Sequence, residues 1–265
     1  SLALARERFY DQGRFADLFA SVKRAPLSLA ETLRAAPGVA EVQLTIEQVV
    51  RISVPASADP ILGQLIGLDT REPQRLNRVV LREGRWPEPG ARADGQLEAL
   101  VSEAFARARG LGPGAQVSAL VNGRRRTLAI TGIALSPEFI FAGLWGMPDQ
   151  RGFGIFWVDH DALAAAYDMA GAFNRLAVKL APGADAALAQ ATLRQQLARY
   201  GGHEVIARAD QTSHAMLDNE IKEQHVLGTV LPSIFLGVAA FLLNVVISRL
   251  VATQREQIAA LKALG

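Results

Sequence analysis

The sequence predicts an α+β fold: a two-lobed extracytoplasmic domain, built as a split α/β sandwich with an inserted β-rich lobe, followed by one transmembrane helix. The helix is predicted by residues 226–247, a run of apolar and small residues that carries no charge. The sandwich is predicted by two segments of matching order, strand–helix–strand, near opposite ends of the remaining chain. The inserted lobe is predicted by a stretch of different composition between them, which holds the clearest hairpin signal in the chain.

The uncharged run, VLGTVLPSIFLGVAAFLLNVVI, is long enough to cross a bilayer. A helix rises about 1.5 Å per residue, and about twenty apolar residues cross a hydrocarbon core of roughly 30 Å. The alternative is a helix buried in a soluble core, but soluble helices rarely stay uncharged over this length. Pro232 does not oppose a span, because proline is tolerated inside membrane helices. We therefore predict a transmembrane helix over residues 226–248.

The charges on either side of this run predict its direction. Residues 219–225 carry two acidic side chains and one basic one, whereas residues 249–265 carry three basic side chains and one acidic one. Basic residues next to a span favour the cytoplasmic side, so the chain before residue 226 is expected outside the cytoplasm. The first residues, SLALARERFY, lack the apolar core of a signal peptide. We therefore expect the chain to be part of a longer protein, with sequence missing at both ends.

The outer lobe is predicted from residues 15–54 and 173–207. Each segment reads as a strand, a break at Ala-Pro, a helix and a second strand. A glycine follows each predicted helix, as is common where helices end. We expect the two segments to pair into one sandwich with its helices on one face, formed by residues 1–75 and 171–211.

The inserted lobe is predicted from residues 76–170. Short apolar runs bounded by glycine and proline indicate strands, and Ser102 is a good N-cap for a helix between two of them. Asn122-Gly123 lies between two alternating runs, which is the strongest short signal for a β-hairpin. Residues 212–225, after the outer lobe, are amphipathic and are predicted to form a stalk helix that continues into the span.

Composition excludes several classes of site. The formal net charge is +2, and the basic residues are dispersed among acidic ones, which argues against nucleic-acid binding. The three consecutive arginines at 124–126 fit a solvated strand better than a contact with an anionic partner. The chain has no cysteine, so it has neither disulfides nor thiol chemistry.

The sequence predicts no catalytic, cofactor or metal site. The glycine-rich turn at 110–114 lacks the lysine and hydroxyl residue of a phosphate-binding loop. The four histidines are spread along the chain, and His214 and His225 would lie about 16 Å apart on one helix. The sequence also has no G-x-S-x-G nucleophile elbow. We therefore expect a protein that is not an enzyme.

Residues 139–157, FIFAGLWGMPDQRGFGIFW, combine six aromatic residues with four glycines. A stretch this rich in glycine is not expected to form one regular element. It is either a loop that presents apolar side chains to a substrate or partner, or a segment whose aromatic rings seal the two lobes together. The candidates for a contact with substrate or partner are Phe139, Phe141, Trp145, Met147 and Phe153.

The C-terminal residues NVVISRLVATQREQIAALKALG resemble the end of the second membrane helix in FtsX-like permeases of ABC transporters. That family commonly follows this span with the pattern R-x-E-I-[AG]-x-L-[KR]-A-[LF]-G. Arg255 and residues 258–265 follow the pattern, whereas Gln257 stands in place of its glutamate. Upstream, LREGRWPEPG and LVSEAFARARGLGPGAQVSALVNGRRRTLAITGIA are similar to the MacB-like periplasmic core domain of the same family.

The resemblance implies a permease subunit of the cell inner membrane, in contact with lipid, with its periplasmic domain between the first and second membrane helices. It also implies a cytoplasmic ABC ATPase, a separate subunit that binds the ATP, and a second permease subunit that is either identical or a sibling. The segment 249–265 then begins the coupling element toward the ATPase. Its expected contact residues are Arg255, Glu256, Gln257, Ile258, Leu261 and Lys262.

The resemblance implies one of two functions. In the first, the subunit transmits motion from the ATPase to the periplasmic lobes for export or extraction of an envelope substrate. In the second, an FtsX-like regulatory or binding module recruits or activates a cell-envelope protein and transports nothing.

Overall fold

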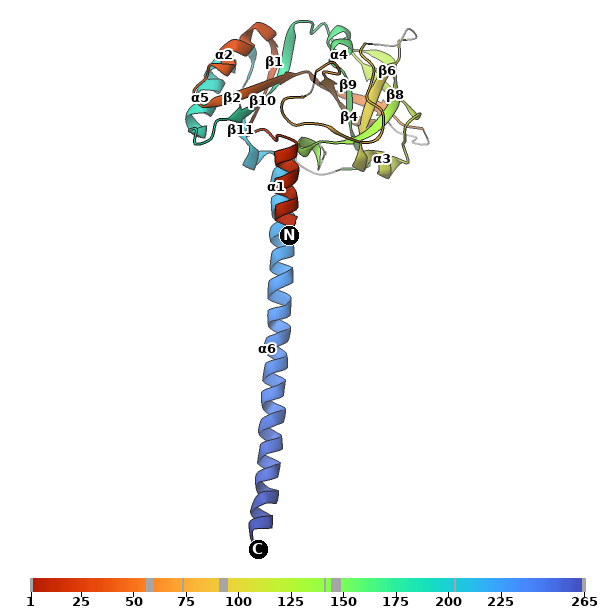
Figure 1. The fold of residues 1–265 in the computed structure, drawn as a ribbon. Helices are drawn as coiled ribbons and strands as arrows, with labels where there is room; N and C mark the ends of the chain where they lie inside the picture. The colour runs from red at the N-terminus through yellow and green to blue at the C-terminus, as the bar shows by residue number, and fades with distance from the viewer. Residues whose placement is uncertain are drawn as a thin grey trace. The chain divides into compact units, whose positions relative to one another are not determined.

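The computed structural model describes residues 2–55, 60–72, 74–90, 95–140, 142–143, 149–202 and 204–263. Residues 1–217 form one compact unit, and residues 218–265 form a second. The first unit holds two β-sheets and several short helices, and the second lies within one long apolar helix (Figure 1). The predicted α+β class with one C-terminal apolar helix is confirmed.

A four-stranded antiparallel sheet joins the two ends of the first unit. Its order is β11-β1-β10-β2, so the central pair unites the two segments that matched in sequence. Helices α2 and α5 cover one face of this sheet, where Leu33, Leu176 and Leu193 are buried (Figure 1). The elements are β1 (Leu18–Pro26), α2 (Ala30–Arg34), β2 (Val39–Thr45), β10 (Ala172–Leu180), α5 (Ala186–Leu197) and β11 (Val205–Ala207).

The second sheet closes on itself. Its order is β5-β8-β6-β9-β4-β3-β7, and β7 also pairs with β8, so that β5 extends the ring beside the C-terminal half of β8. Asn122 and Gly123 have φ values of 44° and 75° and join β7 to β8 as the predicted hairpin. The strands are β3 (Glu47–Ser53), β4 (Ile61–Leu68), β5 (Val80–Gly84), β6 (Leu97–Ser102), β7 (Gln116–Val121), β8 (Arg124–Leu135) and β9 (Phe153–Asp159).

Short helices complete the core of this closed sheet. Phe105 of α3 and Leu163 of α4 lie in the same buried cluster as the inward side chains Leu65, Val101 and Phe156. They bury apolar surface that the strands alone would leave exposed to water. The remaining helices of the first unit are α1 (Leu2–Gln12), α3 (Glu103–Arg109), α4 (His160–Ala166) and the 3₁₀ helices η1 (Leu27–Leu29), η2 (Pro137–Phe139), η3 (Ala198–Tyr200) and η4 (Arg208–Asp210).

The boundary between the two sheets differs from the prediction. The expected outer lobe included all of residues 1–75, but β3 and β4 belong to the closed sheet. The chain crosses from one sheet to the other at Ile46, which is fully buried in the core of the closed sheet and whose carbonyl accepts a hydrogen bond from the Gly67 N–H. The sequence hides this crossing, because the apolar alternation of residues 39–54 continues through it and reads as one strand.

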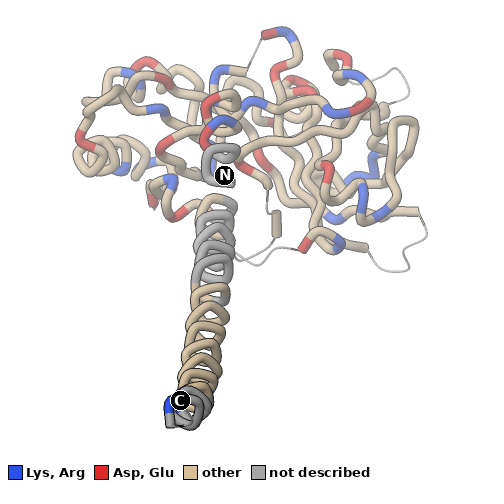
Figure 2. The backbone as a smooth tube through the Cα atoms, turned by 60° about the horizontal axis from the view of Figure 1, so that its bottom comes forward, with Lys and Arg blue, Asp and Glu red and all other residues tan. Residues whose placement is uncertain are grey.

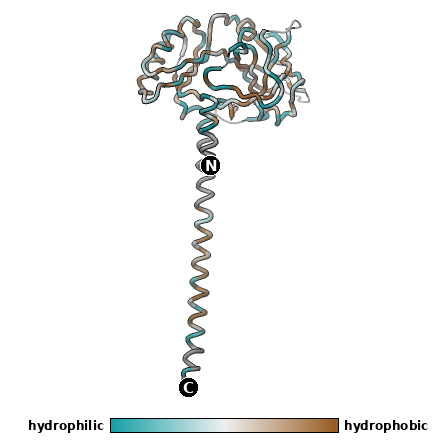
Figure 3. The backbone as a smooth tube through the Cα atoms, in the orientation of Figure 1, coloured by the Kyte–Doolittle hydropathy of each residue, from teal (hydrophilic) through white to brown (hydrophobic). Residues whose placement is uncertain are grey.

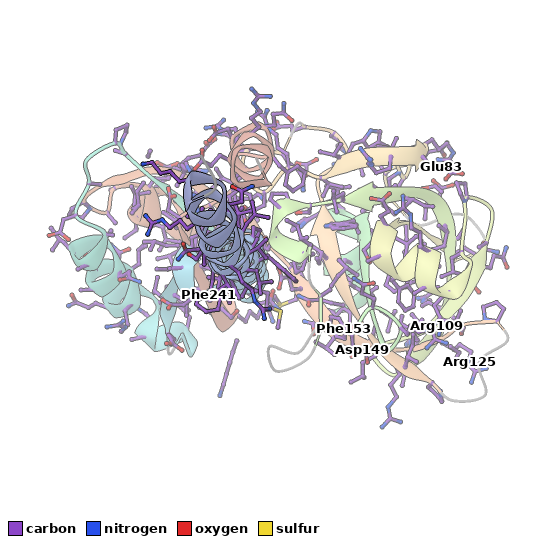
Figure 4. All side chains as sticks on the ribbon, turned by 90° about the horizontal axis from the view of Figure 1, so that it is seen from below. Glu83, Arg109, Arg125, Asp149, Phe153 and Phe241 are labelled. Carbon is purple, nitrogen blue, oxygen red and sulfur yellow. The ribbon has the colours of Figure 1, made fainter. Side chains whose placement is uncertain are left out.

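Helix α6 extends from Thr212 to Ala263 and contains Pro232. It therefore runs through the predicted stalk, span and coupling segments without a break in its helical assignment. Among the described residues, Pro232–Ala252 is long and apolar enough to cross a membrane, with a mean hydropathy of 2.3 (Figure 3). Large side chains such as Phe241 project from it into the surroundings (Figure 4). The division of this helix into stalk, span and coupling segment stays a prediction.

Charged residues are mixed over the first unit (Figure 2). Lysines and arginines lie among aspartates and glutamates rather than on one side, and the described part of the predicted span is free of both. Arg124 and Arg125 are exposed at the start of β8, as a solvated strand end requires. This distribution does not form the basic stripe that nucleic-acid binding needs.

Candidate functional site: a polar junction between the two sheets and helix α6

Five buried or half-buried polar residues meet where the two sheets and the base of α6 come together. We call this group the junction, and it consists of Glu47, Asn77, Glu138, Arg175 and Gln211. They come from β3, the segment before β5, η2, β10 and the residue before α6. Such residues are seldom buried unless they are hydrogen-bonded to one another.

Glu138 is the centre of the junction. Its carboxylate accepts hydrogen bonds from Asn77 Nδ2 at 2.6 Å and from Arg175 Nη2 at 2.8 Å. Its backbone carbonyl accepts a third from Gln211 Nε2 at 2.8 Å. The Ser136 hydroxyl, as N-cap of η2, accepts from the Glu138 N–H and fixes the turn. One buried residue thereby joins three segments that are distant in sequence.

Asn77 ties the chain that follows α1 to this centre. Its Oδ1 accepts from the Ala16 N–H at 2.9 Å, and its own N–H donates to the Arg14 carbonyl at 3.2 Å. Its φ is 49°, in the left-handed region that asparagine tolerates better than most residues. The local backbone and the side-chain bonds therefore both depend on asparagine at this position.

Glu47 and Arg175 connect the two sheets. Asn174, next to Arg175 on β10, exchanges two hydrogen bonds with the Glu47 backbone, each 2.8 Å long. Arg175 Nε lies 3.5 Å from Glu47 Oε1, and Gln64 Nε2 donates to Glu47 Oε2 at 2.7 Å. Glu47, the first residue of β3 in the closed sheet, is thus hydrogen-bonded to β10 of the four-stranded sheet.

The junction contains one cation and two carboxylates. Burial raises the pKa of Glu47 to about 7; Arg175 acts against this, Glu138 adds to it, and the Gln64 hydrogen bond opposes it. For Arg175, burial acts to lower the pKa, but Glu47 and Glu138 more than offset it, so the pKa lies above its ordinary value. Arg175 therefore stays charged, whereas burial brings the pKa of Glu47 close to neutral.

A second set of contacts fixes the base of α6 to the N-terminal segment. Arg208 Nη2 donates to the Phe15 carbonyl at 2.9 Å and to the Asp17 carboxylate, while Arg208 Nε donates to the Ala16 carbonyl at 2.8 Å. Its guanidinium also lies 5.3 Å from the centre of the Phe15 ring. The segment that enters α6 is therefore bound to the segment that leaves α1.

The first turn of α6 adds two contacts. The side-chain oxygen of Gln211 accepts from the His214 N–H at 2.9 Å, which satisfies one of the free amides at the start of the helix. The ring of His214 lies 3.3 Å from the Tyr10 hydroxyl of α1. The side-chain oxygen of Gln211 thus accepts a hydrogen bond from the first turn of α6, and its side-chain nitrogen donates one to the junction.

A cavity of about 230 Å³ lies at the junction. Glu47, Glu138, Arg175 and Gln211 line its polar side, and Phe153 and Ile155 contribute to its apolar side. Among the described residues, no cluster of three or more histidines, aspartates or glutamates is placed to hold a metal ion. The arrangement is suited to holding segments together and to taking up a proton.

Comparison with known families identifies the fold. The MacB-like periplasmic core domain matches residues 5–196, which is most of the chain. The chain belongs to this family. The resemblance noted from the residues is confirmed.

Solved structures similar to this MacB-like chain include the following three. The extracellular domain of the noncanonic ABC-type transporter YknZ from Gram-positive bacteria is 13% identical, covers 72% of this chain and 98% of its own, and gives a TM-score of 0.42. The periplasmic region of MacB from Actinobacillus actinomycetemcomitans is 12% identical, covering 79% and 94%, with a TM-score of 0.44. A domain of a permease protein from Porphyromonas gingivalis is 15% identical, covering 75% and 92%, with a TM-score of 0.42. No curated protein matches the chain.

Two of the predicted contact residues of this MacB-like domain, Phe139 and Phe153, are described by the structure. Phe153 is buried in β9, and Phe139 packs against Trp157 with ring centres 6.2 Å apart. Both belong to an apolar cluster of the closed sheet and both also line the junction cavity, so the choice between a sealing role and contact with a substrate or partner stays a prediction. Phe141, Trp145 and Met147 lie outside the described residues.

The predicted coupling residues lie on α6 in the second unit. Arg255 and Lys262 are exposed. The side chains of Glu256, Gln257, Ile258 and Leu261 lie outside the described residues, and the coupling role stays a prediction.

The sequence reading missed the junction. Its signals were present: Glu138 follows a Ser-Pro capping pattern, and Arg175 and Glu47 interrupt apolar strands with a charge. A charge on an inward position of a strand indicates a buried ion pair. Which partner each charge meets depends on the pairing of the sheets.

Proposed function

We propose that this chain is the periplasmic domain and second membrane helix of an inner-membrane ABC permease subunit, and that α6 transmits motion to the two sheets. The motion comes from a separate cytoplasmic ATPase that binds the ATP, so the subunit itself needs no cofactor and catalyses no reaction. The subunit works with a second permease subunit, identical or sibling, and contacts lipid along the predicted span. Membership of the MacB-like family supports a permease-type role.

The observation that carries the proposal is the hydrogen bond from Gln211 to the Glu138 carbonyl. Gln211 is the residue before α6, and Glu138 is bound in turn to β10 through Arg175 and to the segment after α1 through Asn77. A displacement of the helix base therefore acts on buried, hydrogen-bonded groups, which resist stretching more than exposed contacts do. Arg208 adds a second attachment within the same few residues.

The test separates the helix cap from the junction. Gln211→Glu keeps an oxygen to accept from His214 and removes the N–H that donates to Glu138. Gln195→Glu, at an exposed position of α5, makes the same chemical change away from the junction and is the matched control. Because the chain has no cysteine, spin labels can be placed on introduced cysteines. We choose two exposed positions, Val49 on β3 of the closed sheet and Leu188 on α5, which covers the four-stranded sheet.

The measurement is the distance between the labels in the full permease with its ATPase, reconstituted in lipid, with and without ATP. We expect an ATP-dependent change in distance in the parent protein and in Gln195→Glu. In Gln211→Glu we expect ATP hydrolysis to persist while the change is strongly reduced. An unchanged response in Gln211→Glu would refute the role of the junction. No ATP response in the parent protein would refute transmission and favour the regulatory or binding module.

A further inference from the structure

An exposed tryptophan stands on a rigid loop at the margin of the closed sheet. The indole of Trp86, in the loop after β5, is 43% exposed. Large rigid aromatic side chains exposed in a concave surface are typical of binding sites, because they offer apolar area with little loss of conformational entropy on binding. The surroundings of Trp86 decide whether it is such a site.

The backbone beneath Trp86 is fixed from several directions. Arg85 forms two hydrogen bonds to the carboxylate of Glu98, at 2.8 and 2.6 Å, and the side chain of Glu98 is only 2% exposed. The same guanidinium donates to the Trp86 carbonyl at 3.0 Å, and the Glu88 N–H donates to Glu98 at 2.9 Å. A bidentate arginine–carboxylate pair of this kind is strong and directional. The indole is therefore held out on a preorganised loop.

Trp86 lines a cavity of about 500 Å³. Its other walls come from Leu68 and Val79 and from a set of polar residues. The polar residues are Asp69, Thr70, Arg71, Glu72, Gln74 and Arg78. The loop segment 69–72 is also ordered by its own contacts: Asp69 Oδ1 accepts from the N–H groups of Arg71 and Glu72, at 2.9 and 3.2 Å. The volume lies within the range of small-ligand sites, roughly 300–1,000 Å³.

The chemistry of the lining defines the ligand. Two carboxylates, Asp69 and Glu72, and two guanidinium groups, Arg71 and Arg78, line the cavity, and Arg71 also forms an ion pair with Asp161 at 2.8 Å, so the site offers no excess of positive charge to an anion. The Thr70 hydroxyl donates to Asp159 and the Gln74 side-chain oxygen accepts from the Val79 N–H, so these two side chains offer a ligand only their remaining lone pairs and amide protons. The indole offers one flat apolar face, whose negative π-cloud attracts C–H groups. A ligand that is neutral, rich in hydroxyls and apolar on one face is a pyranose sugar.

We propose that this cavity binds one or two rings of a neutral glycan, with one sugar face stacked on Trp86. The main alternative occupant is a protein partner, but a stable protein interface takes about 800 Å² from each partner. The concave cavity, with apolar walls around a single exposed indole and charged and amide groups at one side, fits a sugar better than such an area. The site lies on the closed sheet and does not depend on the transmission of motion through α6.

The experiment uses the full chain in phospholipid nanodiscs, because sugar-headed detergents would compete for the site. The probes are chitotetraose and cellotetraose, two neutral β-linked tetrasaccharides, and the readout is saturation-transfer NMR on the sugar ring protons. We expect signals from at least one probe, reduced about tenfold or more by Trp86→Ala and retained in part by Trp86→Phe. Leu120→Ala, at an exposed apolar residue of β7, is the control and leaves the signal unchanged.

Each other result counts against the proposal. Signals of equal strength in Trp86→Ala and the parent chain would place the sugar elsewhere. The absence of a signal from both tetrasaccharides would overturn the proposal. A protein ligand whose binding depends on Trp86, while sugar binding does not, would overturn it as well. Because Trp86 is exposed, its replacement leaves the fold intact, and an unchanged unfolding transition of the variant checks this point.

Discussion

The protonation of Glu47 provides a quantitative test of the junction, through the variant Glu47→Gln. Burial raises the pKa of Glu47 from an ordinary value of 4.5 to about 7 in the folded protein. At pH values between 4.5 and about 7, Glu47 therefore holds a proton in the folded state that it has released in the unfolded state. The stabilisation from this proton is complete below pH 4.5 and is lost as the pH rises toward 7. At about 1.4 kcal/mol per pH unit, the loss amounts to about 3 kcal/mol.

Glutamine is neutral at every pH and retains an oxygen that accepts from Gln64. Glu47→Gln therefore removes the contribution of Glu47 to the pH dependence of the free energy of unfolding and leaves the contributions of other groups. We expect the free energy of unfolding of the variant, relative to the parent chain, to rise by about 3 kcal/mol between pH 4.5 and pH 8. Glu83→Gln, at an exposed glutamate at the margin of the first unit, is the matched control and shows no such rise (Figure 4).

The assay is urea unfolding of the full chain, followed by tryptophan fluorescence, at several pH values from 4.5 to 8. Trp157 is buried in the first unit and reports on its unfolding. The comparison of Glu47→Gln with the parent chain cancels the other groups that titrate in this range. If the two proteins show the same pH dependence, Glu47 does not hold its proton at neutral pH and the electrostatic account of the junction is wrong.

Two further predictions concern backbone positions that the fold makes demanding. Asn77→Ala loses buried hydrogen bonds and places alanine at a φ of 49°, so it lowers the free energy of unfolding by about 2–4 kcal/mol. Asn77→Gly loses the same hydrogen bonds but accepts this φ without strain, so we expect a smaller loss. Urea unfolding of both variants tests this, and equal losses would contradict the role of φ. Gly84→Ala makes the added methyl group overlap with the Thr131 carbonyl and destabilises by more than about 2 kcal/mol. Gly90→Ala has a similar φ, and no atom of the described residues lies within 4 Å of the added methyl group, so it costs only about 1 kcal/mol. Equal thermal shifts in the two variants would show that the close approach of Gly84 to β8 is not limiting.

Some features of this protein follow from local sequence. The absence of charge over 22 residues is enough to predict an apolar helix, because a helix of known rise must match a bilayer of known thickness. Asn122 and Gly123 predict a hairpin because few residues accept a positive φ at two successive positions. The strands β1 and β10 were recognisable from the alternation of apolar residues in their sequences, although both faces of each strand hold buried side chains.

Other features depend on which strands pair. The sequence gives no sign that β7 pairs with β8 on one side and with β3 on the other, and so closes the second sheet. It also gives no sign that the chain changes sheets at Ile46, because strands on both sides of that residue carry the same apolar alternation. Alternation reports which face of a strand is buried and is silent about the neighbour that buries it.

The junction lies beyond local patterns for the same reason. Asn174 and Glu47 are 127 residues apart in the chain, and Gln211 and Glu138 are 73 apart. Sequence alone determined that these side chains were polar and that most of their neighbours were apolar. Only the tertiary structure decided that they meet, because a buried polar group is stable only where the pairing of distant strands supplies its hydrogen-bond partner.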